Sequence, residues 1–261
     1  MLLVLSPAKS LDFESTVAPE ILAHASVPLF MDQSAELNAV LRELKASDLA
    51  DLMDLSESLA ELNFRRNRAW SRRMTAKNSR PAVLAFNGDV YDGLQAKSLP
   101  LADLLWAQER IAILSGLYGV LRPLDRMQAY RLEMGRPLRH AAGSGLYSFW
   151  GDSLALHLNK RSAKHHPQVL VNLASQEYFK SVKRKSLQAR VVECVFEDFK
   201  NGDYKVISFF AKRARGLMAR FAITERLTDV EQLKFFDAEG YRFTAAASGA
   251  DQWVFRRKVT V

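Results

Sequence analysis

The chain has 261 residues, of which 48% are hydrophobic and 25% charged, a composition that is typical of a globular domain and excludes intrinsic disorder. The length favours one large core, so we expect a single domain over residues 1–261. Lys and Arg outnumber Asp and Glu by 37 to 29, and this excess favours an acidic partner such as nucleic acid or an anionic membrane surface, although a charge that only keeps the protein in solution is an equal alternative.

The chain opens on an apolar run that predicts a first strand over residues 2–5. The run is short and has no basic leader, so it does not resemble a signal peptide. No later stretch reaches the ~18 uninterrupted apolar residues that a membrane span needs. We therefore expect a cytoplasmic protein without a membrane partner.

Ser6 and Pro7 fit the N-cap and the first position of a helix that begins directly after this strand. The amino end of a helix attracts anions, and Lys9 would add a positive charge. The segment Ser6–Lys9 could thus bind a small anion such as phosphate or a carboxylate, although a plain helix start is the simpler alternative.

Apolar residues at helical spacing predict two further helices over 34–46 and 47–62. A basic stretch over 64–73 follows, in which arginines alternate with Phe64 and Trp70, and it continues to Lys77 and Arg80. Aromatic side chains among arginines could stack nucleic-acid bases, but a charged, frayed helix end has the same composition.

A strand is expected over 82–87, a helix over 100–109 and another strand over 111–115. Gly116 and Gly119 then predict a tight turn, with Arg122 just beyond it, whose exposed N–H groups could bind phosphate. The turn is similar to the hairpin of a helix-hairpin-helix element, although that motif usually has one residue between its glycines. A purely structural turn is the alternative.

The second half of the chain predicts a helix over 153–161 and strands over 168–173, 190–198 and 204–210. A third basic cluster, Lys180, Lys183, Arg184 and Lys185, lies between the first two of these strands. Asn201 and Gly202 join the last two as a hairpin, because both residues tolerate positive φ. The single cysteine, Cys194, excludes an internal disulfide, and within a strand it is better explained as a buried, inert thiol than as a reactive one.

The last long helix is expected over 212–226, with a capping box at Thr228 and Glu231 opening a further short one. One arc of the long helix is apolar, through Phe210, Ala214, Leu217, Met218 and Phe221. The other arc carries Lys212, Arg213, Arg215 and Arg220 with Gly216 among them, and no acid occurs between residues 209 and 223. Small residues between guanidinium groups would let a phosphate approach the backbone, so we interpret this face as a polyanion-binding surface, with an ordinary solvated face as the alternative.

Strands and helices alternate irregularly, with hairpins among them. The pattern predicts an α+β fold, a single compact mixed domain with a central mixed sheet or a barrel-like core surrounded by helices, and not a regular βαβ array. The sequence has neither a dinucleotide-binding glycine fingerprint nor a phosphate-binding P-loop. Its five histidines show no metal spacing, so we expect no metal and no cofactor.

Five carboxylates have sequence neighbours that could support general acid–base chemistry: Asp89, Asp125, Glu133, Asp152 and Glu177. Helix caps and internal salt bridges are the more common roles of such residues. If the protein is an enzyme, we expect Asp89, Tyr91, Tyr118, Asp125 and Glu177 to line one pocket at the floor of a basic cleft.

The chain resembles the YaaA family of bacterial peroxide stress proteins along nearly its whole length. The resemblance rests on the segments 5–9 (LSPAK), 86–94 (FNGDVYDGL), 114–119 (LSGLYG), 121–125 (LRPLD), 130–135 (YRLEMG), 146–147 (LY), 149–152 (FWGD), 172–175 (NLAS), 177–180 (EYFK) and 211–216 (AKRARG). It implies a cytosolic protein that helps the cell to survive hydrogen peroxide, partly by limiting damage linked to free iron. It also implies DNA binding in a positively charged cleft with a helix-hairpin-helix element.

The first hypothesis is therefore a DNA-binding protein of peroxide defence that contacts the backbone without sequence preference. The residues that we assign to DNA are Lys212, Arg213, Arg215, Gly216, Arg220, Gly116, Gly119, Arg122, Lys180 and Lys183. The alternative is an enzyme that acts on a nucleotide or on a base in DNA, for example by N-glycosidic cleavage, with a carboxylate at the base of the cleft. Direct sequestration of iron is the least favoured, because the chain offers few ligands for it.

Overall fold

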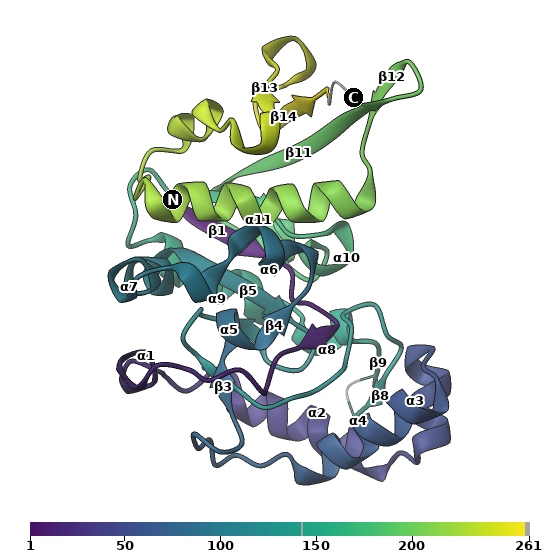
Figure 1. Cartoon of the computed structure of the whole chain (residues 1–261). Helices are drawn as coiled ribbons and strands as arrows, with labels where there is room; N and C mark the ends of the chain where they lie inside the picture. The colour runs from purple at the N-terminus through teal and green to yellow at the C-terminus, as the bar shows by residue number, and fades with distance from the viewer. Residues whose placement is uncertain (142, 259–261) are drawn as a thin grey trace.

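A mixed sheet of eight strands forms the centre of the computed structural model, which describes residues 1–141 and 143–258 (Figure 1). The strand order is β13-β14-β11-β10-β1-β5-β6, and β12 pairs with β11. Five neighbouring strands are parallel: β1 (Leu2–Leu5), β5 (Ile111–Ser115), β10 (Val169–Leu173), β11 (Arg190–Lys200) and β14 (Gln252–Arg257). The antiparallel ones are β6 (Gly119–Leu121), β12 (Asp203–Lys205) and β13 (Arg242–Phe243). The expected α+β class with a central mixed sheet is confirmed, and the sheet is open rather than barrel-like.

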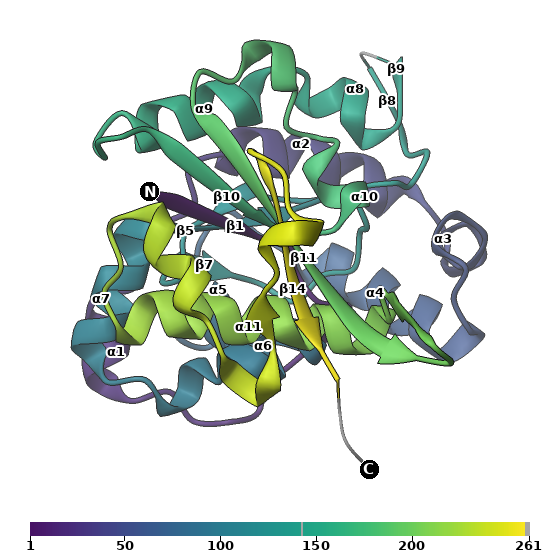
Figure 2. The same ribbon diagram turned by 90° about the horizontal axis from the view of Figure 1, so that it is seen from above.

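Helices cover both faces of this sheet, as Figure 2 shows. One face carries α11 (Ser208–Thr224), against which α6 (Asp89–Leu94) and α7 (Leu101–Arg110) pack. The other face carries α8 (Leu146–Trp150) and α9 (Ser153–Ser162). Because β1 is covered on both sides, every one of its four side chains is buried, and the strand has a continuous apolar sequence instead of an alternating one.

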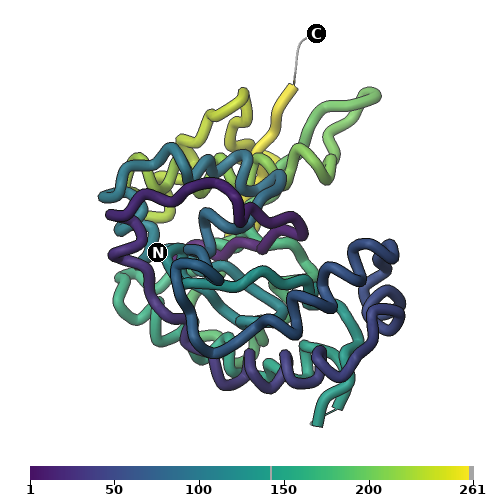
Figure 3. Tube along the Cα trace, turned by 60° about the horizontal axis from the view of Figure 1, so that its bottom comes forward, coloured from purple at the N-terminus to yellow at the C-terminus, as the bar shows by residue number. Residues whose placement is uncertain are grey.

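The helices of the first quarter of the chain lie together at the end of the molecule that is remote from β12–β14 (Figures 1 and 3). They are α2 (Met31–Glu43), α3 (Ala46–Met53) and α4 (Glu57–Ala69), and α1 (Pro19–Ala23) precedes them. The prediction of one helix over 47–62 is wrong, because these residues are divided between α3 and α4. Asp54 adopts a left-handed conformation with φ of 53°, which ends α3.

The strand predicted over 82–87 is also wrong for most of its length. Residues Ala82–Ala85 form the short helix α5, and only Phe86–Asn87 is extended, as β4. All four residues of α5 are buried, and a fully apolar run of this length has no periodicity that could distinguish a helix from a strand. The remaining short elements are β2 (Ser10–Leu11), β3 (Arg80–Pro81), η1 (Ala96–Ser98), β7 (Arg126–Met127), β8 (Arg139–His140), β9 (Gly143–Ser144), α10 (Gln176–Phe179), η2 (Arg184–Ser186), η3 (Val230–Phe235), η4 (Ala238–Gly240) and η5 (Ala245–Ala247).

The other predicted elements are confirmed within a few residues, including the hairpin between β11 and β12. Asn201 and Gly202 have φ of 56° and 86° there, the positive values that a tight two-residue turn needs. The strand over 204–210 is largely wrong, because β12 ends at Lys205 and α11 begins at Ser208. The capping box at Thr228 is wrong as well, since the side chain of Asp229 caps η3 by accepting a hydrogen bond from the Glu231 N–H.

None of the helices in the described part of the chain combines the length and the apolar character that crossing a membrane requires.

Cys194 lies in β11 with 2% of its surface exposed, and burial raises the pKa of its thiol to about 12. Only the thiolate reacts readily with peroxide, and a raised pKa suppresses it. We therefore expect the folded protein to consume no hydrogen peroxide through Cys194 and to react with a thiol-labelling reagent only after it is unfolded. Fast labelling of the native protein, compared with Cys194→Ser as the blank, would contradict this assignment.

Candidate functional site

The sheet has a topological switch point between β1 and β10. The chain leaves β1 for β5 on one side and leaves β10 for β11 on the other, so the two connections diverge at the carboxyl ends of these strands. In open α/β sheets, ligands bind in the crevice that such a divergence leaves. The residues that follow the two strands, Ser6 and Ser175, are therefore placed where a site is expected.

A cavity of about 380 Å³ opens at this point, and we call it the carboxyl-edge cavity. Five parts of the chain, remote in sequence, build it: the segment after β1, the start of α6, the segment that contains Glu133, the segment after β10, and the first half of α11. Its lining residues are Ser6, Pro7, Ala8, Lys9, Ser10, Asn87, Gly88, Asp89, Val90, Glu133, Ser175, Glu177, Tyr178, Lys212 and Arg215.

Glu133 is the buried carboxylate of the carboxyl-edge cavity, with 6% of its surface exposed. Arg131 donates from Nε to its Oε1 at 2.8 Å, and Lys9 Nζ lies 3.6 Å from the same oxygen. Arg136 Nε lies 3.6 Å from Oε2, which is beyond hydrogen-bond distance, so Oε2 is buried without a donor among the described residues. An unpaired carboxylate oxygen that lines a cavity can accept a hydrogen bond from a ligand.

Arg215 brings the opposite charge to the same cavity. Burial lowers the pKa of its guanidinium group, an effect that the nearby Glu193 only partly offsets. Within residues 1–141 and 143–258 its Nε is buried without any acceptor. A guanidinium keeps its charge even so, and it therefore presents donors that an anion can take.

Lys212 and Asp89 form the outer part of the cavity. Lys212 Nζ lies 3.8 Å from Asp89 Oδ2, an ion pair without a hydrogen bond, and half of the lysine side chain is exposed. Glu177 is exposed, and its Oε1 accepts a hydrogen bond from the Gly135 N–H at 2.9 Å.

The segment Ser6–Lys9 is not the helix start that we expected, because the chain runs in an irregular conformation from β1 into β2. Ser6 is held on three sides. Its Oγ accepts from the Ser175 N–H at 2.8 Å and lies 3.3 Å from Ser175 Oγ, while the Tyr91 hydroxyl donates to its carbonyl at 3.0 Å. The segment reaches the cavity through tertiary contacts rather than through a helix amino end.

Comparison with known proteins decides the family. The family model of the peroxide stress protein YaaA matches residues 1–247. The chain belongs to the YaaA family. It is 61% identical to UPF0246 protein Bpet1601 of Bordetella petrii over 258 residues, which cover 99% of this chain and 100% of the relative. UPF0246 proteins of Albidiferax ferrireducens and Paracidovorax citrulli are 59% and 60% identical, over 99% of this chain and 98% and 99% of theirs.

In this YaaA-family fold, α11 does not present the open cationic face that we predicted. Arg213 donates from Nε and Nη2 to Glu239 Oε1, at 2.8 and 2.6 Å. Arg220 donates to the carbonyls of Leu94 and Gln95 at the end of α6. These two arginines fasten α11 to its neighbours, whereas Lys212 and Arg215 line the carboxyl-edge cavity.

The role expected for Gly216 is wrong, because α6 occupies the space that a phosphate was to use. A Cβ added at Gly216 would lie 1.8 Å from the Val90 carbonyl oxygen. The small residue serves helix packing and leaves the backbone inaccessible.

The prediction that the turn at Gly116 and Gly119 forms a phosphate site or a helix-hairpin-helix element is likewise wrong. It joins β5 to β6 and is buried, with Leu132 against Gly116 and Trp150 against Gly119. Arg122 is paired within its own turn, where it donates to Asp125 from Nε and Nη2. The structural alternative therefore holds for this turn.

The third basic cluster follows α10, whose residues Glu177 and Tyr178 line the carboxyl-edge cavity. Lys180 lies over the Tyr147 ring at 5.1 Å, and Lys183 Nζ lies 3.6 Å from Asp152. The second basic stretch includes Arg66, which lies at the end of α4 near Arg131. Burial, and next the positive charge of Arg131, lower the pKa of Arg66. Members of the first two clusters thus come near Glu133 or its partner Arg131, whereas Lys180 and Lys183 line a separate cavity beside α10.

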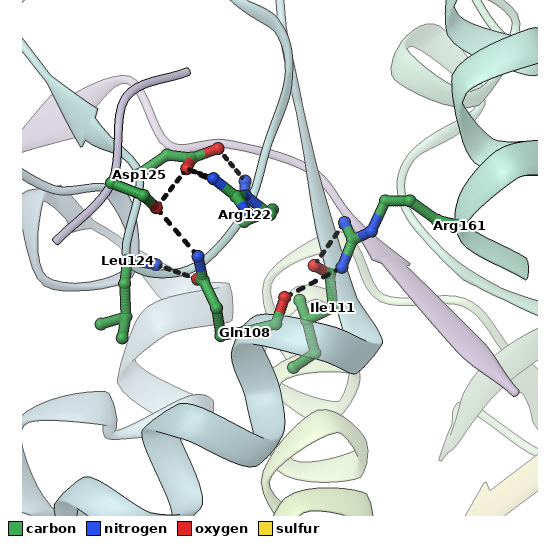
Figure 4. A network of polar contacts seen from close by, with 7 residues as sticks. Gln108, Ile111, Arg122, Leu124, Asp125 and Arg161 are labelled. Atoms are coloured by element: carbon green, nitrogen blue, oxygen red, sulfur yellow. Dashed lines mark hydrogen bonds and ion pairs between the residues drawn. The ribbon is translucent and has the colours of Figure 1, made fainter. Parts of the chain in front are cut away.

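Three of the five candidate carboxylates, Asp89, Glu133 and Glu177, meet in the carboxyl-edge cavity. Asp125 does not, since it is buried in a network with Arg122 and Gln108 elsewhere (Figure 4). Asp152 is exposed and accepts from Ser186 Oγ at 2.8 Å. Tyr118 is buried between Trp70 and Gln128 and is not part of the cavity lining. In the described ranges, no group of three or more His, Cys, Asp or Glu residues is placed to hold a metal ion.

Proposed function

We propose that this peroxide stress protein binds the DNA backbone, without sequence preference, through the cations around the carboxyl-edge cavity. The observation that carries the proposal is the state of Lys9 and Lys212 at the cavity. Their side chains are 64% and 51% exposed, and their acidic partners lie at 3.6 and 3.8 Å, too far for hydrogen bonds. Both ammonium groups can therefore turn to a phosphate at little cost.

Other cations extend this surface along the carboxyl edge of the sheet. Lys180 and Lys183 follow α10 on one side of the cavity, and Arg136 and Arg66 lie on the side of Glu133. The excess of eight positive charges over the whole chain adds a long-range attraction for a polyanion. The ammonium group of a lysine on its flexible stem acts as a point charge, which fits contact with the phosphate backbone.

The resemblance to the YaaA family implies survival of hydrogen peroxide and less iron-linked damage, and the proposed DNA binding would place the protein on one of the molecules that such damage reaches. The family assignment supports the stress role. The cationic surface supports a polyanionic partner, and the resemblance favours DNA over a membrane as that partner.

The salt dependence of DNA binding tests this proposal. If the surface neutralises ~5 phosphates, the logarithm of the affinity should fall against the logarithm of the salt concentration with a slope near −4 to −5. The double variant Lys9→Ala, Lys212→Ala should weaken binding to duplexes of unrelated sequence alike and reduce that slope by about 1–2.

The matched control is the double variant Lys160→Ala, Lys164→Ala, which removes two exposed lysines beyond the opposite edge of the sheet. It should leave the slope unchanged. A flat salt dependence of the wild type, or an equal effect of the two double variants, would refute the proposed surface.

A second candidate function is enzymatic, and Glu133 favours it. A buried carboxylate with an oxygen free of hydrogen bonds in a cavity can act as a general base or a nucleophile, roles that cleavage of an N-glycosidic bond can use. The test is to incubate the protein with DNA that contains damaged or modified bases and to measure released base. Release that Glu133→Gln abolishes would support this candidate, and no release from any substrate would count against it without affecting the backbone proposal.

A further inference from the structure

Two residues of opposite charge that line the carboxyl-edge cavity each have a buried polar atom, Glu133 Oε2 and Arg215 Nε, without a hydrogen-bond partner in the described chain. We propose that this cavity binds one nucleotide unit, with the phosphate on Arg215 and Lys212 and an O–H or N–H donor of the sugar or base on Glu133. The inference names a ligand for the cavity that the enzymatic candidate uses, but it requires no catalysis. It shares Lys212 with the backbone surface, and its tests use Arg215 and Glu133, which the backbone test leaves unchanged.

Arg215 supplies the first step, because it is more buried than Lys9 and Lys212, the other cations that line the cavity. Its Nε is buried without an acceptor, and burial lowers the pKa of the group. A desolvated guanidinium gains most from an anion whose oxygens match its planar fork, and phosphate fits that fork with two parallel hydrogen bonds.

Lys212 supplies a second charge on the same helix, three residues earlier and thus on the same side of α11. Its ammonium lies 3.8 Å from Asp89 and lines the same cavity. A ligand phosphate with two negative charges can be shared between Arg215 and Lys212, whereas a carboxylate would use only one of them.

Glu133 determines the other end of the ligand. Arg131, Lys9 and Arg136 surround this carboxylate, which fixes its position, while Oε2 still lacks a donor. The group that pairs with Oε2 must therefore carry an O–H or N–H, as sugars and bases do. Inorganic phosphate would bring only further negative charge to Glu133, and a nucleoside would bring no anion to Arg215.

The size and the place of the cavity agree with one nucleotide. Its volume of about 380 Å³ is near the lower end of the ~300–1,000 Å³ that ligand sites span, enough for one such unit and not for a dinucleotide. It lies at the switch point of an open sheet, where phosphorylated ligands characteristically bind.

Isothermal titration of the full chain tests the proposal with deoxyguanosine 5′-monophosphate and thymidine 5′-monophosphate, their nucleosides and inorganic phosphate. We expect a nucleotide to bind at least tenfold more tightly than its nucleoside or phosphate alone. Arg215→Gln and Glu133→Gln should each weaken nucleotide binding about tenfold or more, and Arg215→Lys should have a smaller effect, because it keeps the charge but not the fork.

Arg213→Gln is the matched control, since it makes the same change on the same helix outside the cavity. Thermal unfolding of each variant shows that the fold is retained. A nucleotide affinity that is the same in wild type, Arg215→Gln and Glu133→Gln would overturn the proposal, as would equal binding of nucleotide and nucleoside.

The ligand could be a free nucleotide or a unit turned out of a DNA strand, and a second titration separates the two. A duplex with one unpaired, bulged nucleotide is compared with the fully paired duplex. Loss of bulge binding in Arg215→Gln and Glu133→Gln, with no binding of free nucleotide, assigns the site to the strand. Binding of free nucleotide alone assigns it to the small molecule, and no dependence of any probe on either residue refutes the site. The affinity for the fully paired duplex is measured separately. Weak or salt-independent binding of that duplex would contradict the backbone proposal without bearing on the nucleotide site.

Discussion

Replacing Gly216 by alanine is expected to destabilise the protein by about 4 kcal/mol or more, above the ~1–3 kcal/mol of ordinary overpacking. The added Cβ would lie 1.8 Å from the Val90 carbonyl oxygen and 2.8 Å from the Leu94 nitrogen, both backbone atoms of α6. Alanine is favoured over glycine within a helix by only ~1 kcal/mol, so the clash outweighs the gain in helix propensity. Chemical denaturation of the purified variant measures the difference.

The contact is mutual, which sharpens the expectation. On α6, a Cβ at Gly93 would lie 2.2 Å from the Arg213 carbonyl oxygen, so each helix places a glycine against the backbone of the other. Gly93→Ala should therefore be as damaging as Gly216→Ala. Gly249→Ala is the control, because no atom lies within 4 Å of its added Cβ, and its stability should change by less than about 0.5 kcal/mol. A Gly216→Ala protein within 1 kcal/mol of wild type would show that α6 can move away.

Gly216 also shows where sequence reasoning reaches its limit. The spacing of apolar residues correctly predicted α11, but it placed Phe210 in the buried face, and that ring is 38% exposed. Ala211, Ala219 and Ala222 are buried in its place, since α11 packs against the sheet and against α6 as well. Small residues on a helix occur both where the backbone is open to a ligand and where it packs closely against another helix. Only the position of α6, which is set by tertiary packing, distinguishes the two.

The sequence indicates several residues of the carboxyl-edge cavity, but it does not indicate that they lie together in one site. The sequence around Glu133 and Asp89 predicts acid–base chemistry, whereas the sequence around Arg215 predicts a polyanion-binding face. What joins them is the order of β10, β1 and β5, which places Ser6 and Ser175 side by side although 169 positions separate them. A single sequence contains no signal for that order, so Arg136 and Ser175 were not named as site residues.

Asp125→Ala is the second substitution with a large expected effect, a loss of about 3–5 kcal/mol of stability. Asp125 is 1% exposed. Its Oδ2 accepts from the Arg122 N–H at 2.8 Å, and its Oδ1 accepts from Ser26 Oγ at 2.7 Å and from Arg122 Nε and Nη2 at 3.0 and 2.9 Å. Alanine would leave all of these donors without this acceptor, and two of them belong to the Arg122 guanidinium, whose side chain is 37% exposed.

The destabilisation should extend beyond this turn, because the hydrogen-bond network of Asp125 continues to β5 of the central sheet (Figure 4). Gln108 donates to Ser26 Oγ at 3.0 Å and accepts from the Leu124 N–H at 2.7 Å. The buried Arg161 in turn donates to the carbonyls of Gln108 and Ile111, at 3.0 and 2.9 Å. Asp125 therefore holds the loop after β6 against the end of α7 and the start of β5.

Two comparisons separate this structural role from the catalytic role that the sequence left open for Asp125. Asp125→Asn keeps the size and most acceptors of the side chain, so it should cost less than alanine, about 2 kcal/mol. Asp32→Ala, which removes an exposed ion pair with Arg72, should cost less than about 1 kcal/mol. If Asp125→Ala instead unfolded like wild type in denaturant but lost an activity on nucleotides or DNA, the carboxylate would belong to a site and not to the framework. Both carboxylate oxygens of Asp125 accept hydrogen bonds from within the chain, which argues for the framework.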